Sequence, residues 1–166
     1  MALEITSTEA LWFLPFVLPI CVWVAWTDLS LMLIRNKAVV TLVAVFLVVG
    51  LIALPLPEYP WRLVTMFIVL LIGIAINAAG LAGAGDAKFI AAAAPFIDPG
   101  DAVILCMLFA ANLVAAVTAH RIAKNTGLRN LAPNWESWSR PEKFPMGFSL
   151  GGTLAIYLIL GVMYGQ

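Results

Sequence analysis

The stretch LVTMFIVLLIGIAINAAGLA, residues 63–82, runs directly into GAGDAK at residues 83–88. Its apolar part has about 20 residues, the length that an α-helix needs to cross a lipid bilayer. An aspartate beside such a run is costly to keep close to lipid, so the position of Asp86 favours a functional interpretation. The stretch therefore predicts a transmembrane helix that ends at a polar residue with a role.

Further apolar runs on both sides of this stretch indicate an integral membrane protein. Runs at residues 11–27, 38–56, 102–119 and 148–164 are long enough to span a bilayer, and a run at 87–97 is about half as long. The chain has 166 residues, of which 63% are hydrophobic and 11% charged, whereas about 25% are charged in soluble domains. No Lys or Arg precedes the first run, so we expect it to be retained and not cleaved as a signal peptide. We predict an all-α protein with a single transmembrane domain over residues 1–166.

The distribution of basic residues decides how the short run at 87–97 is interpreted. If it crosses the membrane and the N-terminus is outside, eight of the nine Lys/Arg residues lie inside. These are Arg35, Lys37, Lys88, Arg121, Lys124, Arg129, Arg140 and Lys143. If the run is instead re-entrant, the segment 120–147 and its five cations move outside, against the positive-inside rule. The sequence therefore predicts six transmembrane helices, the N-terminus and C-terminus outside, and a cytoplasmic loop at residues 120–147.

Two aspartates are the candidate catalytic residues. Asp28 ends the first apolar run and Asp86 closes the GAGD sequence, and the predicted topology puts both on the same side of the membrane. Two carboxyl groups close together in a poorly solvated site cannot easily both ionise. The charged one can take a proton from water and the neutral one can donate a proton to a peptide carbonyl, as in aspartic proteases. Gly83 and Gly85 are expected to allow close backbone approach and turn conformations.

Each aspartate also has a simpler interpretation. A single aspartate at a helix end is more often a solvated boundary residue, and small residues such as those of GAGD commonly serve helix packing. The alternative is therefore a non-enzymatic membrane protein in which Asp28 and Asp86 line a proton or ion path or support assembly of a secretion complex. Turnover of a substrate by the purified protein separates the two functions.

Three separate segments resemble the type IV prepilin peptidase family of GxGD membrane aspartic proteases, in particular the short members that serve tight-adherence (Flp) pili. Asp28 is followed by Ile-Arg-Asn at residues 34–36, where the family has Ile-Pro-Asn. The GAGD sequence is followed by Lys88, and the sequence KFPMG at residues 143–147 is similar to the family's Pro-x-Gly entry to its last helix. Arg35 stands where proline is usual, and Met146 where an aromatic residue is common.

The resemblance implies that Asp28 and Asp86 form the catalytic pair of an aspartic endopeptidase. The residues that it assigns to support of the site are Gly83, Gly85, Lys88, Asn36, Pro145 and Gly147. The substrates implied are pilin precursors, cut after a basic leader at the cytoplasmic face of the bacterial inner membrane, with the lipid bilayer and pilus-assembly proteins as further partners. It implies no metal and no cofactor. The nine Lys/Arg residues balance the nine Asp/Glu residues, so the net charge indicates no nucleic-acid partner. The chain lacks the Cys-rich insert of longer members that also methylate the new N-terminus, so N-methyltransferase activity is not expected.

Other polar residues within the apolar runs receive structural interpretations. Cys21 and Cys106 have no metal-binding spacing and are predicted to be small buried apolar residues. Asn77 and Asn112 are predicted to form hydrogen bonds between helices. None of these residues is expected to take part in the chemistry.

Overall fold

The computed structural model describes residues 2–140 and 143–166. Within these ranges the chain forms six α-helices, which are α1 (Ser7–Leu31), α2 (Asn36–Ala53), α3 (Tyr59–Ala78), α4 (Ala84–Ala93), α5 (Ala102–Asn125) and α6 (Met146–Tyr164). Four short 3₁₀ helices lie at Ala94–Phe96 (η1), Pro99–Asp101 (η2), Gly127–Leu131 (η3) and Glu136–Trp138 (η4). Extended pairing in the described residues is limited to an isolated bridge between Leu3 and Gly165. The predicted all-α fold class is confirmed.

Five of the helical segments are long and apolar enough to cross a membrane. They are Ser7–Leu31, Asn36–Ala53, Tyr59–Ala78, Pro99–Asn125 and Met146–Tyr164. The sixth helix, α4, has 10 residues and is followed by the 3₁₀ turn η1. The chain is therefore a multi-pass membrane protein, while the count of six crossings and the orientation of the termini stay predictions.

The helix boundaries differ from the predicted runs at two places. The helix α4 begins at Ala84, so it includes Asp86, and it ends at Ala93 before the predicted end at residue 97. The helix α5 continues to Asn125, so residues 120–125 of the predicted loop are helical. Residues 141–142 of that loop lie outside the described residues.

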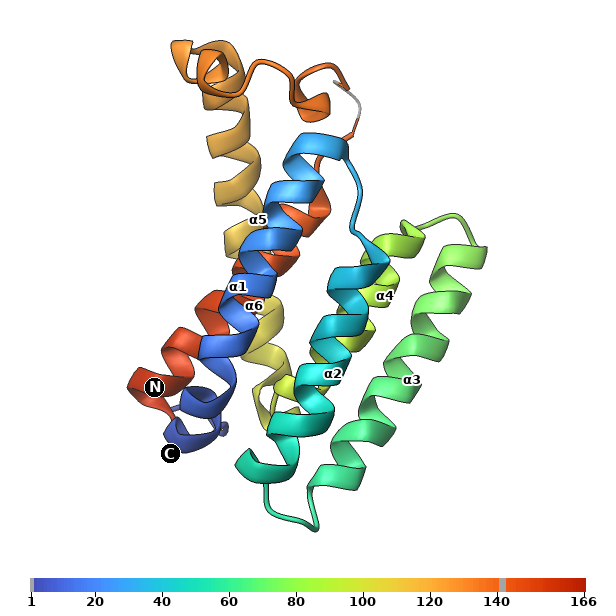
Figure 1. Cartoon of the computed structure of the whole chain (residues 1–166), viewed down its shortest axis with the longest axis vertical. Coiled ribbons are helices and arrows are strands. Elements are labelled where there is room, and N and C mark those ends of the chain that lie inside the picture. Colours follow the sequence, from blue (N-terminus) through green and yellow to red (C-terminus); the bar gives the residue numbers. More distant parts are fainter. Residues whose placement is uncertain (1, 141–142) are drawn as a thin grey trace.

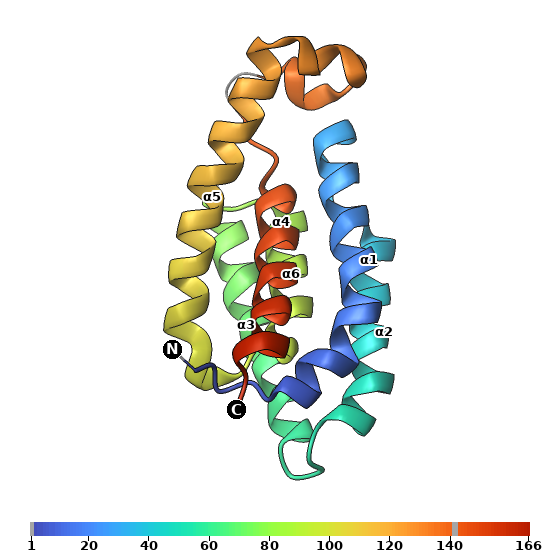
Figure 2. The same cartoon turned by 90° about the vertical axis from the view of Figure 1, so that its left-hand side faces the viewer.

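Successive helices run in alternating directions, and the N- and C-termini lie at the same end of the bundle (Figure 1). We call this the termini end and the opposite one, where Asp28 and Asp86 lie, the aspartate end. The most extensive helix contacts are those of α1 with α6 and of α3 with α4, and α2 contacts both α1 and α4. The helix α5 packs on α6, which lies between α5 and α1 (Figure 2).

Aromatic rings fill the core near the termini end. Phe13 of α1 and Phe46 of α2 both meet the ring of Phe96, with centroids 4.9 and 5.3 Å apart in edge-to-face geometry. Tyr59, at the start of α3, stacks on Phe46 at 5.5 Å. Edge-to-face and stacked pairs of this kind add to the free energy gained by burial, so four segments are fixed to one another here.

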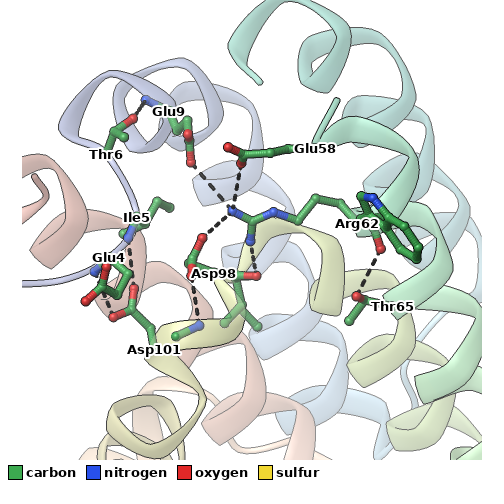
Figure 3. A network of polar contacts seen from close by, with 12 residues as sticks. Glu4, Ile5, Thr6, Glu9, Glu58, Arg62, Thr65, Asp98 and Asp101 are labelled. Carbon is green, nitrogen blue, oxygen red and sulfur yellow. Dashed lines mark hydrogen bonds and ion pairs between the residues drawn. The ribbon is translucent and has the colours of Figure 1, made fainter. Parts of the chain in front are cut away.

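A network of charged groups lies at the termini end (Figure 3). Arg62 of α3 is 4% exposed and donates hydrogen bonds to the carbonyl of Ile97 and, at 2.6 Å, to the carboxylate of Asp98. Glu9 and Glu58 each lie 3.9 Å from the same guanidinium group. The sequence had shown Arg62 only as the one cation expected outside, without its burial or its partners.

Asn112 and Asn77 differ in what their amides bind. Asn112 of α5 donates to the carbonyl of Ser149 and to the hydroxyl of Thr153 on α6, so its predicted hydrogen bonding between helices is confirmed. Asn77 donates to the carbonyl of Ala82, five residues further along the chain. The interhelical interpretation of Asn77 was therefore wrong, since its amide binds the loop that leads to α4.

Candidate active site

Asp28 lies in the last turn of α1, which ends because Met32 adopts a left-handed conformation with φ of 51°. Its side chain is buried, and its Oδ2 accepts a hydrogen bond of 2.6 Å from the backbone N–H of Gly147. Gly147 belongs to the first turn of α6, which is buried along α1. The carboxylate of Asp28 is therefore oriented by the N-terminus of a neighbouring helix, where exposed N–H groups favour negative charge.

Asp86 lies in the first turn of α4, after Gly83 in the N-cap position. Its side chain is partly buried, and its carboxyl is close to the backbone of Gly83. Asp86 lies outside the five long helices, in the first turn of the shorter helix α4.

The two aspartates line the same cavity at the aspartate end. Its volume is about 510 Å³, and its walls come from three parts of the chain. The end of α1 and the next residues contribute Asp28, Met32 and Ile34. The α3–α4 connection and the start of α4 supply residues 80–83, 85 and 86, and the entry to α6 supplies Lys143, Phe144 and Met146. The cavity therefore has two carboxyl groups in its walls, which come from different helices.

The predicted supporting residues are divided between two cavities. Gly83 and Gly85 line the cavity of the aspartates, and Gly147 contacts Asp28 directly. Lys88 instead binds the side-chain oxygen of Asn36 at 3.3 Å. This pair lies in a neighbouring cavity of about 400 Å³, between the start of α2 and the other side of α4. Gly85 lines both cavities, whereas Gly83 lines only that of the aspartates. Lys88 and Asn36 line only the neighbouring cavity.

The glycines serve close approach and not unusual backbone conformation. Gly83 has an extended backbone, with φ of −68°, and Gly85 is helical, so the predicted turn conformations were the wrong reason for them. A Cβ on Gly147 would lie 3.0 Å from the Cβ of Asp28 and 2.9 Å from Ile34. Such distances are too short for unstrained packing, so glycine at 147 allows α6 to approach Asp28.

The remaining predicted residues and some unpredicted ones complete the walls. Pro145 is buried and precedes α6 as its N-cap residue, which starts the helix that carries Gly147. Ile34, Phe144 and Met146 form apolar walls that sequence reasoning did not assign to the site. Their only signal was proximity to the Ile-Arg-Asn and Pro-x-Gly segments. Among the described residues, no group of three or more His, Cys, Asp or Glu side chains could hold a metal ion.

The sequence model of the type IV leader peptidase family matches residues 15–119. The chain belongs to the type IV leader peptidase family. Comparison with curated proteins and with solved structures gave no match. The match contains both aspartates but excludes α6, so the contact of Gly147 with Asp28 is known from the structure and not from the family. The resemblance seen in the sequence is confirmed, and the chain is a leader peptidase in the general sense of its family.

Proposed function

We propose that this leader peptidase is an aspartic endopeptidase that removes the basic leader of Flp-type pilin precursors, with Asp28 and Asp86 as its catalytic pair. The observation that carries the proposal is that both carboxyl groups line one cavity although they come from α1 and α4. Carboxyl groups are rare in this chain, which has nine Asp and Glu residues in 166. Two of them at one cavity, in a chain of this family, are best explained by shared chemistry.

The chemistry follows from the joint titration of two close carboxyl groups. When one is charged and the other protonated, the charged group takes a proton from water as the water attacks the scissile carbonyl. The protonated group donates its proton to the carbonyl oxygen, which gives a tetrahedral gem-diol. The C–N bond then breaks as the pair passes the proton taken from water to the leaving amine, so the leader keeps the new carboxyl group and the mature pilin keeps the new amine. The proton belongs to the pair, so the acid and base roles are not divided between Asp28 and Asp86.

The charges of the bundle support an orientation of the protein in the membrane. Eight Lys/Arg residues belong to segments at the aspartate end, and Arg62 lies at the termini end. By the positive-inside rule, the aspartate end then faces the cytoplasm of a bacterial cell and both termini face outward. We infer six crossings, with α4 and η1 as the short fourth one, and cleavage at the cytoplasmic side of the inner membrane.

Processing of a precursor in cells tests the catalytic pair. A Flp-type prepilin is co-expressed with wild type, Asp28→Asn or Asp86→Asn, and leader removal is followed by gel shift and mass spectrometry. Each variant is expected to lose at least about 10²–10⁴-fold in rate, because general acid–base catalysis contributes that much. Glu58→Gln is the matched control, since it removes an exposed carboxylate at the termini end. Normal processing by either correctly inserted aspartate variant rejects the mechanism.

Cleavage by purified protein in detergent separates the peptidase from the non-enzymatic alternative. A peptidase acts on the precursor without an ion gradient and without a secretion complex, whereas an ion path has no turnover of this kind. We expect cleavage at the leader junction by wild type and none by Asp86→Asn in the same detergent.

A further inference from the structure

A second cavity lies beside α4, α5 and α6 and differs in character from that of the aspartates. Its volume is about 240 Å³, and its lining is almost entirely apolar. Its lining includes Ile90, Leu105, Cys106, Leu150 and Thr153. Ile90 and Cys106 are both exposed, so the cavity opens on the part of the bundle that faces lipid. We call it the lateral groove.

The chemistry of the lateral groove selects an apolar occupant. The hydroxyl group in the lining of the groove is that of Thr153. It donates to the carbonyl of Ser149 at 2.8 Å and accepts from the amide of Asn112 at 3.0 Å. These bonds satisfy the hydroxyl within the protein, so it offers little to a polar ligand. A dry cavity of about 150 Å³ can hold a benzene ring. The lateral groove is therefore suited to one or two large apolar side chains of a helix lying across its opening.

The lateral groove continues the cavity of the aspartates along the same two helices. Ile90 lies four residues after Asp86 on α4, and Leu150 lies four residues after Met146 on α6. Residues at this spacing share a helix face and are separated by about 6 Å along the axis. Asp86 and Met146 line the first cavity, and Ile90 and Leu150 line the second. The groove therefore begins about one helical turn from the site of cleavage, deeper in the bundle.

We propose that the lateral groove seats apolar side chains of the substrate's own transmembrane helix, which follows its leader. This inference rests on the proposed function, since it assumes a substrate in which an apolar helix adjoins the bond that is cut. Such a helix must lie within the bilayer next to the cavity of the aspartates. The groove offers it an apolar contact at that depth, on the helices that carry Asp86 and Gly147. A lipid acyl chain is the competing occupant, and the test distinguishes the two.

Cysteine cross-linking in membranes tests which molecule occupies the groove. Cys106 is exposed and lines it, whereas Cys21 is buried, so Cys21→Ala leaves one reactive thiol. The prediction that Cys106 is buried was therefore wrong, and its exposed thiol can serve as a native cross-linking site. Prepilins with one cysteine at successive positions of the apolar helix are co-expressed in an Asp86→Asn background and oxidised. We expect disulfides to Cys106 that recur every three to four residues of the prepilin helix.

The control moves the thiol by one position. Cys106→Ser combined with Met107→Cys places it on an exposed part of α5 that does not line the groove, where Met107 is 63% exposed. Cross-linking at 107 is expected to be at least tenfold weaker. Equal cross-linking at 106 and 107, or none at 106, overturns the proposal and is the result expected if a lipid acyl chain fills the groove.

A bulky substitution supplies a kinetic test that separates this inference from the proposed function. Leu105→Trp narrows the groove, and Val114→Trp, on the exposed side of α5, is its control. For Leu105→Trp we expect the KM for full-length prepilin to rise at least fivefold, with cleavage of a leader peptide that lacks the apolar helix unchanged. If Leu105→Trp lowers cleavage of both substrates equally, the proposal that the groove binds the apolar helix is contradicted. If wild type cleaves neither substrate, the proposed function fails, while the cross-linking result still reports what lies in the groove.

Discussion

The two ends of the bundle use buried carboxyl groups in opposite ways. At the termini end, Asp101 is 0% exposed and accepts hydrogen bonds from the N–H groups of Glu4 and Ile5 and from the hydroxyl of Tyr157. At the aspartate end, Asp28 is 5% exposed and accepts from Gly147, yet it also faces a cavity of about 510 Å³. Burial is nearly the same, and the difference lies in what surrounds the carboxyl group.

This difference shows that two equally buried carboxylates can differ in the acceptor capacity that their partners leave open. A carboxylate whose lone pairs are filled by protein donors stabilises the fold and has nothing left to offer a ligand. One that faces a cavity keeps acceptor capacity for water or substrate. The termini end therefore holds the helices together, and the aspartate end leaves a cavity beside Asp28. Substitutions at the two ends should separate stability from activity.

The largest effect on stability is expected from Arg62→Met at the termini end. The change leaves the carboxylate of Asp98, and those of Glu9 and Glu58 nearby, without their shared cation. Removal of one partner of a buried ion pair costs about 3–5 kcal/mol, so the free energy of unfolding should fall by about that amount. Reversible unfolding in mixed micelles, followed by circular dichroism, measures it.

Lys88→Met, which replaces a cation at the aspartate end by methionine, is the control for Arg62→Met. Lys88 is exposed, so Lys88→Met should change the free energy of unfolding by less than about 0.5 kcal/mol. If the two substitutions cost the same, the network around Arg62 does not hold the termini end together, and the contrast between the ends fails.

Gly147→Ala is expected to lower stability less than Arg62→Met does. Its main effect is expected on activity. The new methyl group would lie 2.9–3.0 Å from Ile34 and Asp28, so α6 must move or the Asp28 carboxyl must turn. Overpacking of this kind costs about 1–3 kcal/mol, and misplacement of a catalytic group by about 1 Å can lower the rate about 10²-fold. Initial rates of prepilin cleavage in detergent, set beside unfolding in the same detergent, measure both.

Gly127→Ala is the matched control for Gly147→Ala. It adds the same methyl group in the loop after α5, where nothing lies within 4 Å of the new Cβ. Its activity and stability should equal those of wild type. Full activity of Gly147→Ala, in contrast, means that close approach of α6 to Asp28 is not needed for cleavage.

The sequence predicted what depends on local pattern and on charge. Apolar run length gave the helices, and the position of Asp28 and Asp86 at the ends of two runs gave the pair that lines one cavity. The burial of Arg62 was not predictable in this way, because it depends on groups from α1, the start of α3 and the connection before α5 meeting in space. A lone Arg between apolar runs looks the same in the sequence whether it faces water or a buried carboxylate.

The supporting residues show the same limit at the aspartate end. Gly83, Lys88 and Asn36 are near the aspartates in the motifs, and nothing in the sequence says which side of α4 each one faces. Lys88 lies two positions after Asp86, and residues two apart do not share a helix face. That spacing explains why the structure puts Lys88 in the neighbouring cavity with Asn36. The motif therefore contains Lys88, but it does not indicate which cavity Lys88 lines.

The smallest effect is therefore expected from Lys88→Met on activity. The ammonium group of Lys88 is held by Asn36 at 3.3 Å on an exposed surface, where a polar contact contributes little. We expect the rate of prepilin cleavage to stay within about threefold of wild type, since the loss of a contact of about 0.5 kcal/mol changes a rate by little more than twofold. Asn36→Ala, which removes the other partner, should behave alike. A loss comparable to that of Gly147→Ala would place Lys88 in contact with the substrate, and the active region would then extend around both sides of α4.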